Sequence, residues 1–233
     1  MCTVTFFPLN DRVVLTSNRD EKTNRPTLSP KTYQFDETKL LFPKDKKAGG
    51  TWFVAKEDGT VIILLNGAFE NHRKKIGYAK SRGIVLLEVI KAKKPLEFYK
   101  KMNLEGIEPF TLIYFFEDKL IEMKWDEEQK HIYNHAVTQN HIWSSATLYS
   151  KEQRESKKKR FDNFIHDTYA ITENKILNFH QKTQLNNKEY DFIINRRNIL
   201  KTVSITQISI QNKSINMKYV DVENTEIFEN IKF

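Results

Sequence analysis

The hydrophobic and polar positions near the start of the chain predict a β-hairpin. Residues 2–7 are mostly β-branched and aromatic, as in a strand, and residues 8–11 have turn chemistry. Residues 13–17 predict a second strand that pairs with the first. The tetrapeptide Asn-Arg-Asp-Glu at 18–21 follows this strand, so the hairpin is expected to bring it back near residue 2.

The next segments predict a long connection and then a buried strand. Residues 23–47 are polar and contain three prolines, which is typical of a functional or mobile connection. Residues 51–55 and Val61–Leu65 flank Asp-Gly, a strong hairpin signal. Because Val61–Leu65 is continuously apolar, we expect a central strand covered on both faces, ending at Asn66.

The rest of the chain alternates between helical and strand patterns. Ser81 is placed to cap a helix, and Pro95 to open a short one. Further helices are predicted over Lys151–Tyr169, with an apolar stripe that ends at Tyr169, and over Glu173–Phe179. Further strands are predicted over Thr111–Phe116, Leu120–Trp125, His131–Asn134, residues 142–145, Thr202–Ile210 and Ser214–Val222. This order predicts two antiparallel sheets between helix layers, in one domain spanning residues 1–233.

Composition narrows the class of protein. With 233 residues, 39% of them hydrophobic and 12% aromatic, the chain can bury a substantial core and is not intrinsically disordered. Its single cysteine excludes an internal disulfide framework and a cysteine-based zinc site, and a reducing cytoplasm is the default location. We expect no targeting segment and no segment that spans a membrane.

The net charge of +8 comes in large part from two basic runs, Lys44–Lys47 and Lys157–Arg160. Such runs are usually solvated faces, and an anionic partner is the alternative. No zinc-finger spacing or aromatic RNA-binding pattern is present, so we expect no nucleic-acid partner. An interaction scaffold that uses Lys157–Arg160 would explain none of the ordered motifs described below.

Cys2 is the single cysteine and directly follows Met1. Aminopeptidases remove Met1 when the second residue is small, which would leave a thiol and a free α-amine on Cys2. That amine has a pKa of about 7.7–8.0 and can take a proton near neutral pH. A nucleophile activated by its own terminal amine is a known catalytic solution. The alternative is a small buried residue at the start of a strand.

Several short motifs in this chain resemble those of one family, and they occur in the family's order. The family is the NRDE family, also called the transport and Golgi organisation protein 2 family, and the resemblance covers essentially the whole chain. The motifs are Met1-Cys2-Thr3, Asn18-Arg19-Asp20-Glu21, Arg25-Pro26, Gly49-Gly50-Thr51-Trp52, Asn66, Ser81-Arg82-Gly83, Ser144–Leu148 and Thr202–Thr206.

The family is similar in outline to the N-terminal-nucleophile hydrolases, especially the branch with choloylglycine hydrolase and penicillin acylase. The resemblance therefore implies an α+β fold, a four-layer αββα sandwich. It implies that Cys2 is the nucleophile and that Arg19 and Asp20 hold its thiolate and amine. It also implies that Asn66, at the end of a central strand, helps to form the oxyanion hole. These four residues are the predicted catalytic residues.

Each motif also has a structural interpretation. Arg19 and Asp20 can form an ion pair that anchors the hairpin, and Asn66-Gly67 can be a turn. The Gly-Gly-Thr-Trp motif can be a loop that lets Trp52 pack. Two positions depart from the family pattern, with Ser145 in place of an asparagine and Val203 in place of an arginine. The predicted binding residues are Asn18, Trp52, Arg82, which can reach an anionic ligand, and Ser145.

Two functions follow from the sequence. The first is hydrolysis of a non-peptide C–N amide bond through an acyl-Cys2 intermediate, with no cofactor required. The second, implied by the resemblance alone, is a non-catalytic carrier of haem, lipid or acyl-CoA. The candidate haem contacts are the histidines at 72, 131, 135, 141, 166 and 180, none in a ligand motif. The expected partner is thus a small-molecule amide, haem or an acyl ligand.

Overall fold

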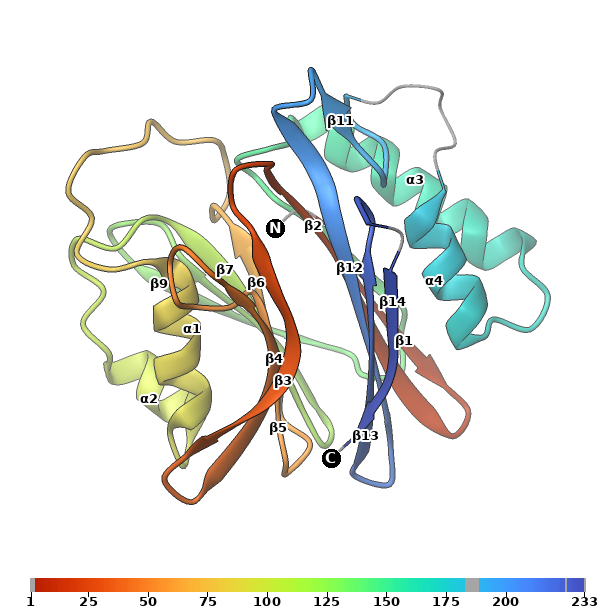
Figure 1. The fold of residues 1–233 in the computed structure, drawn as a ribbon, viewed down its shortest axis with the longest axis horizontal. Helices are drawn as coiled ribbons and strands as arrows, with labels where there is room; N and C mark the ends of the chain where they lie inside the picture. Colours follow the sequence, from red (N-terminus) through yellow and green to blue (C-terminus); the bar gives the residue numbers. More distant parts are fainter. Residues whose placement is uncertain (1–2, 183–188, 225, 233) are drawn as a thin grey trace.

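A computed structural model describes residues 3–182, 189–224 and 226–232, so Cys2 lies outside the described residues. Two antiparallel sheets lie face to face, and helices cover the outer face of each (Figure 1). The predicted four-layer αββα sandwich is therefore confirmed. Within the described part of the chain, no helix has both the length and the apolar character needed to cross a membrane.

The first sheet contains both ends of the described chain. Strand β1 (Thr3–Leu9) pairs with β2 (Arg12–Lys22) through the predicted hairpin, with Thr3 opposite Asn18. Along the sheet, the order is β10 (His141–Ser144), β1 (Thr3–Leu9), β2 (Arg12–Lys22), β12 (Leu200–Gln211), β13 (Ser214–Asp221) and β14 (Glu226–Lys232), with the short β11 (Asn195–Arg196) paired to β12.

The second sheet is formed by strands that follow one another in sequence. Strand β6 (Val61–Asn66) is at the centre of this sheet, and its side chains are almost entirely buried, as its continuous apolar run predicts. Along the sheet, the order is β3 (Thr27–Phe35), β4 (Thr38–Asp45), β5 (Phe53–Lys56), β6 (Val61–Asn66), β7 (Phe110–Phe116), β8 (Lys119–Trp125) and β9 (Lys130–His135).

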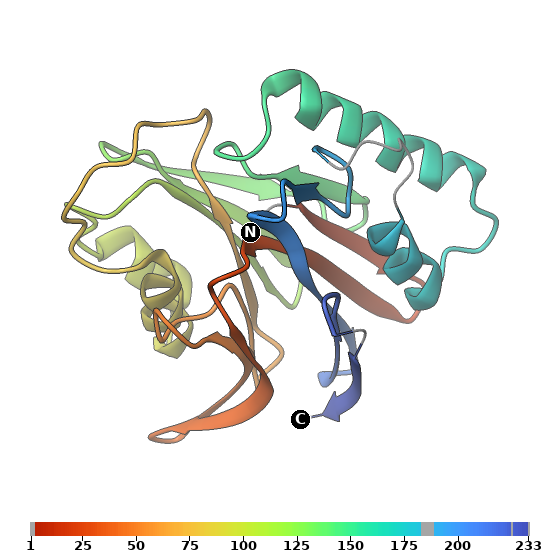
Figure 2. The same cartoon turned by 45° about the horizontal axis from the view of Figure 1, so that its top comes forward.

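The helices form the two outer layers. One pair lies against the second sheet and the other pair against the first, as Figure 2 also shows. Ser81 is at the predicted N-cap position of the first helix, but its side chain makes no capping hydrogen bond. The helices are α1 (Arg82–Lys91) and α2 (Pro95–Lys101) on the second sheet, and α3 (Lys151–Asp167) and α4 (Glu173–Gln181) on the first.

The alternation of side chains along β1 separates two cores. Val4 and Phe6 face the second sheet and belong to the main hydrophobic core, whereas Phe7 packs against α3 and α4. Thr3 and Thr5 also face the helices, since they contact Lys157 and His180. Each strand of the first sheet therefore offers one set of side chains to the space between the sheets and the other to the helix layer.

Three of the predictions are corrected by the structure. The polar segment 23–47 is not an unstructured connection, because most of it forms the β3–β4 hairpin. Strand β2 does not stop at residue 17 but continues to Lys22, so the Asn-Arg-Asp-Glu tetrapeptide lies within it. Tyr169 lies beyond the end of α3 and is 93% exposed, so it is not part of the buried stripe of that helix.

Candidate functional site

A cavity of about 690 Å³ lies beside the ends of β2 and β6, beneath the segment at 74–80 and the start of α1. Four of the seven described residues predicted for the site line it, namely Arg19, Trp52, Asn66 and Arg82. The other lining residues are Glu21, Arg25, Asp45, Ala48, Gly50, Thr51, Leu64, residues 74–78, Lys80, Ser81, Gly83 and Glu108.

Arg19 connects the two sheets at the wall of the cavity. Its guanidinium donates to the carboxylate of Asp45 at 2.9 Å, to the Thr27 hydroxyl at 3.1 Å and to the carbonyl oxygen of Arg25 at 3.2 Å. The side chain is almost fully buried. Burial lowers the pKa of Arg19, an effect that the carboxylates of Glu21 and Asp45 oppose.

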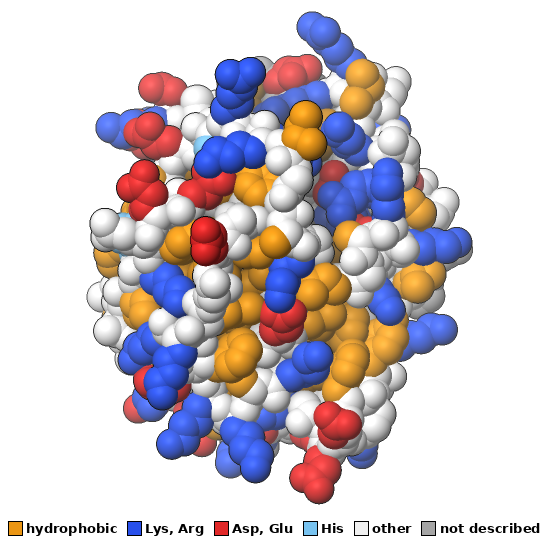
Figure 3. Space-filling model, turned by 90° about the vertical axis from the view of Figure 1, so that its left-hand side faces the viewer, with side chains coloured by type: hydrophobic (Ala, Val, Ile, Leu, Met, Phe, Trp, Pro, Cys, Tyr) orange, Lys and Arg blue, Asp and Glu red, His pale blue; other side chains and the backbone are white. Residues whose placement is uncertain are grey.

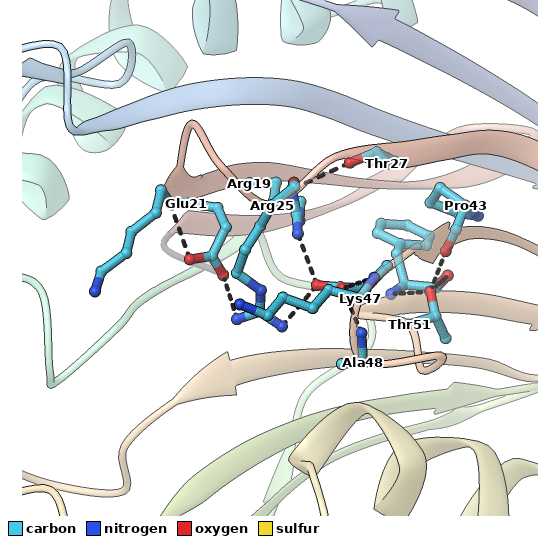
Figure 4. A network of polar contacts seen from close by, with 11 residues as sticks. Arg19, Glu21, Arg25, Thr27, Pro43, Lys47, Ala48 and Thr51 are labelled. Carbon is cyan, nitrogen blue, oxygen red and sulfur yellow. Dashed lines mark hydrogen bonds and ion pairs between the residues drawn. The ribbon is translucent and has the colours of Figure 1, made fainter.

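Asp45 is shared by two arginines, Arg19 and Arg25, which Figure 4 labels. Its Oδ2 lies 2.9 Å from Arg19 and 2.7 Å from Arg25, and its Oδ1 accepts the backbone N–H groups of Lys47 and Ala48. The carboxylate therefore fixes the loop after β4 to both guanidinium groups. The predicted partner of Arg19 in the hairpin was Asp20, and the ion pair is made with Asp45 instead.

Trp52 forms another part of the cavity wall, and it is 3% exposed. The guanidinium carbon of Arg19 lies 4.3 Å from the centre of its ring, which is cation–π geometry. Its indole N–H is buried, and no described residue accepts a hydrogen bond from it. The Gly-Gly-Thr-Trp motif thus lets Trp52 pack, as one of the predictions has it, and the indole N–H of this side chain is buried in the wall.

Asn66 ends the central strand at the cavity, the place predicted for an oxyanion-hole residue. Its carbonyl oxygen accepts a hydrogen bond from the Ser145 hydroxyl at 2.9 Å. Gly67 follows with a φ of +81° and packs tightly against Thr147, so a side chain there would be strained. Ser145 does not line the cavity and acts instead on the backbone that presents Asn66.

Arg82 lies at the first position of α1 and reaches away from the helix. It donates to the carbonyl oxygen of Pro109 at 3.0 Å and pairs with Glu108 at 3.3 Å. Burial lowers its pKa, and the Glu108 carboxylate opposes this shift. Ser81, the preceding residue, has a buried hydroxyl with no hydrogen-bond partner among the described residues.

Asn18 and Asp20 lie on the opposite face of β2 from Arg19, because neighbouring residues of a strand point to opposite faces. The Asn18 amide donates to the carbonyl oxygens of His180 and Phe192. Asp20 accepts hydrogen bonds from the Tyr149 hydroxyl at 2.7 Å and the Thr202 hydroxyl at 2.6 Å. The structure therefore brings neither side chain to the cavity wall.

A buried lysine lies beneath the first described residue of β1. Lys157 is fully buried, and its ammonium donates to the Thr3 hydroxyl at 3.1 Å and to the Asp191 carbonyl oxygen at 2.8 Å. It also lies over the ring of Tyr149 at 4.1 Å. The basic run Lys157–Arg160 is therefore not simply a solvated face.

His180 completes the polar layer between the first sheet and α4. It is fully buried, with one ring nitrogen 2.8 Å from the Thr5 hydroxyl and the other hydrogen-bonded to the Asn18 amide oxygen. Burial, with a smaller contribution from the charge of Lys157, lowers the pKa of His180 to about 3. The imidazole is therefore neutral at physiological pH and links β1, β2 and α4.

The sequence alone did not indicate several residues of this site. Asp45 lies within a run of lysines, so its pairing with Arg19 has no local signal. Glu108 follows a turn far from Arg82 in sequence. None of the six histidines lines the cavity. Within the described ranges, no cluster of three or more His, Cys, Asp or Glu side chains is placed to hold a metal ion.

A family model described as transport and Golgi organisation 2 matches residues 1–226. The chain belongs to the transport and Golgi organisation 2 family. This confirms the resemblance that the ordered motifs carry. No curated protein sequence matches this family member. In this chain, the family's Asn-Arg-Asp-Glu tetrapeptide lies in the long strand β2, whose side chains point alternately to the second sheet and to the helix layer.

Solved structures show what fold this transport and Golgi organisation 2 protein has. An N-acylethanolamine-hydrolyzing acid amidase ortholog from Caenorhabditis elegans matches with a TM-score of 0.62 and 10% identity, over 89% of this chain and 92% of that chain. A cysteine-to-alanine mutant of a conjugated bile acid hydrolase from Clostridium perfringens matches with a TM-score of 0.56 and 9% identity, over 99% and 92%. The protein therefore has an N-terminal-nucleophile-hydrolase-like fold.

Proposed function

We propose that this protein hydrolyses a non-peptide C–N amide bond, with Cys2 as the nucleophile after removal of Met1. The observation that carries the proposal is that Arg19 and Asn66 line one cavity and that the strand carrying Arg19 pairs with the start of β1. Thr3, to which Cys2 is bonded, pairs with Asn18, the residue before Arg19. Covalent geometry keeps the Cα of Cys2 within about 3.8 Å of that of Thr3.

The reaction begins with attack by the Cys2 sulfur on the amide carbonyl carbon. The thiol proton passes to the α-amine, and the carbonyl C=O opens to an oxyanion. The C–N bond then breaks, the leaving amine takes the proton, and a thioester remains on Cys2. Water adds to the thioester and returns a proton to the sulfur through the α-amine, which releases the carboxylic acid and restores the thiol.

The residues around the cavity supply the other parts of this chemistry. The positive charge of Arg19 favours the thiolate form of a nearby cysteine. The side-chain amide of Asn66 is a donor for the oxyanion, and the hydrogen bond from Ser145 holds its backbone in place. Asp20 is our candidate for orienting the α-amine on the ground of the family resemblance, and its carboxylate lies on the face of β2 opposite to Arg19, where it accepts hydrogen bonds from Tyr149 and Thr202.

The named activities of the similar structures support an amide substrate. One is described as an acid amidase that hydrolyses N-acylethanolamines, and the other as a hydrolase of conjugated bile acids. At about 10% identity these proteins share the fold with this chain. The amide class is thus our proposal, and it agrees with the position of Asn66 at the end of a central strand.

A panel of N-acyl amides tests the proposal, with release of free amine as the readout. Wild-type protein is expected to turn over at least one amide, and Cys2→Ala to be slower by about a thousandfold or more. Mass spectrometry of acid-quenched protein should show the acyl group on the peptide that contains Cys2. Turnover that persists in Cys2→Ala, or no turnover of any amide, would contradict the proposal.

Asn66 provides a matched pair of variants. Asn66→Ala removes the proposed oxyanion donor and should lower kcat by about 10²–10³-fold. Asn134→Ala removes an exposed asparagine on β9 and should leave kcat unchanged. Equal kcat values for the two variants would show that Asn66 is not a catalytic residue. The role of Cys2 would then still be tested by Cys2→Ala.

A further inference from the structure

We propose that the substrate of this cavity carries an anionic oxygen group, a carboxylate or a phosphate. This inference rests on the proposed function and names the chemical class of its substrate. It is based on hydrogen-bond donors in the cavity wall that have no acceptor among the described residues, and on the charges of the residues around them.

Three buried polar atoms of the wall lack a hydrogen-bond partner among the described residues, namely the Trp52 indole nitrogen, Arg25 Nε and the Ser81 hydroxyl. The first two are donors only and cannot accept a hydrogen bond. Buried donors without acceptors are costly, and they are satisfied when a ligand or water supplies the acceptor. The wall thus holds donor groups that an acceptor oxygen of a ligand would satisfy.

The acidic residues of the wall are already engaged. Glu21 pairs with Arg25 at 3.0 Å, Asp45 with both Arg19 and Arg25, and Glu108 with Arg82. No carboxylate of the described lining is therefore left to repel an anion or to bind a cationic ligand.

Basic residues outnumber acidic ones in the described lining by six to three, which leaves a formal charge of +3 on it. The excess comes from Lys74, Lys75 and Lys80 in the segment that covers the cavity. Two of these lysines pair with carboxylates outside the lining, Glu127 and Glu88, whereas Lys74 has no ion-pair partner in the described part of the chain. A positive rim of this kind attracts an anionic ligand.

The face that carries α1 and the covering segment is drawn in Figure 3, where hydrophobic areas lie among lysine, arginine and acidic side chains. The cavity wall itself is mixed, since Leu64, Ile76 and Tyr78 line it together with the charged residues. A ligand with one anionic end and an apolar acyl part matches both features. We therefore infer an N-acyl amide that bears an anionic group.

Binding to the Cys2→Ala protein tests this inference without turnover. The probes are N-dodecanoylglycine, its uncharged analogue N-dodecanoylethanolamine, and the phosphate ester of that analogue. Titration calorimetry should show that at least one anionic probe binds about tenfold or more tightly than the uncharged one. The two anionic probes then distinguish a carboxylate site from a phosphate site.

Two variants locate the anion in the cavity. Trp52→Phe keeps an aromatic side chain but removes the pyrrole part of the indole with its N–H, and should weaken binding of the preferred anionic probe by roughly tenfold. Lys74→Gln replaces an exposed side chain, so the variant is expected to fold. It should lower the affinity for the anionic probe severalfold and make that affinity less dependent on salt. Trp143→Phe and Lys158→Gln are the matched controls outside the lining and should bind the probe as the parent does.

Equal affinity for charged and uncharged probes, or an affinity for the anionic probe that Lys74→Gln leaves unchanged, would overturn the inference. Because binding is measured on Cys2→Ala, these outcomes are independent of catalysis. Failure of the proposed function would instead show as no Cys2-dependent hydrolysis of any amide, even of those that bind.

Discussion

Gly50 and Gly83 meet backbone to backbone at the cavity. A methyl group on Gly50 would lie 2.5 Å from the carbonyl carbon of Gly83, and one on Gly83 would lie 2.7 Å from the Thr51 carbonyl oxygen. This contact joins the Gly-Gly-Thr-Trp loop to the start of α1. The contact thereby brings Trp52, which follows Gly50 in the loop, and Arg82, which precedes Gly83, into one cavity wall.

Replacing Gly50 with alanine should therefore strongly destabilise the protein. The new methyl group would collide with backbone atoms that cannot rotate away, and a loss of about 3 kcal/mol or more is expected in urea unfolding. Gly106→Ala is the comparison, since its φ is +69° but its nearest neighbour would lie at 3.7 Å. That variant should lose only about 1–2 kcal/mol. Equal losses would contradict the close approach.

The ion pair between Arg19 and Asp45 should contribute more to stability than a surface pair. Asp45→Asn leaves two guanidinium groups without their shared carboxylate, and a loss of about 3–5 kcal/mol in the free energy of unfolding is expected. Asp162→Asn breaks the exposed pair with Lys158 and should cost at most about 1 kcal/mol. Similar losses in the two variants would show that Asp45 is solvated.

His180 should make stability depend on pH in the acid range. Its folded-state pKa of about 3 lies below the ordinary value of 6.5, so between these values the unfolded chain binds a proton that the folded chain does not. Stability therefore falls as pH falls from 6.5 toward 3, by about 1.4 kcal/mol for each pH unit.

The measurement is urea unfolding at several pH values for wild type and His180→Gln. The variant should show a flatter dependence between pH 6 and 4, about 1.4 kcal/mol less per unit, because the buried imidazole is gone. His166→Gln removes an exposed imidazole and should retain the wild-type slope. Parallel slopes for wild type and His180→Gln would mean that the buried histidine is protonated when folded.

The hydroxyl of Tyr149 should stabilise the carboxylate of Asp20. Tyr149→Phe removes a buried hydrogen bond to a charged group, and a loss of about 1.5–3 kcal/mol is expected by urea unfolding. Tyr133→Phe, at an exposed tyrosine on β9, should change stability by less than about 0.5 kcal/mol. A Tyr149→Phe protein as stable as wild type would indicate that water replaces the lost hydroxyl.

Hydrophobic periodicity and turn chemistry predicted most of the fold. The β1–β2 hairpin, the central strand β6 and the helix that begins after Ser81 all follow from local patterns. The β3–β4 hairpin was missed because its prolines and polar side chains suit an exposed edge of a sheet as well as a loop. Local sequence does not distinguish the two, since pairing with β5 decides the outcome.

The candidate site was predictable only in part. Arg19, Trp52, Asn66 and Arg82 share the cavity, although the sequence gives no spacing that links them. Because β2 extends through the tetrapeptide at 18–21, neighbouring residues of the tetrapeptide face alternately toward the cavity and away from it. That extension depends on the pairing of β2 with β12, which is far away in the sequence. The burial of Lys157 in a basic run likewise depends on the strands that α3 covers.

The central claim is that Cys2 carries a free α-amine and a reactive thiol beside this cavity. Intact mass of the native protein, followed by labelling with 2-cyanobenzothiazole, tests it directly, since this nitrile condenses with a thiol and an α-amine on the same residue. The account predicts a mass without Met1 and one label per chain, lost in Cys2→Ala. A mass that retains Met1, or a native protein that takes no label, would contradict it.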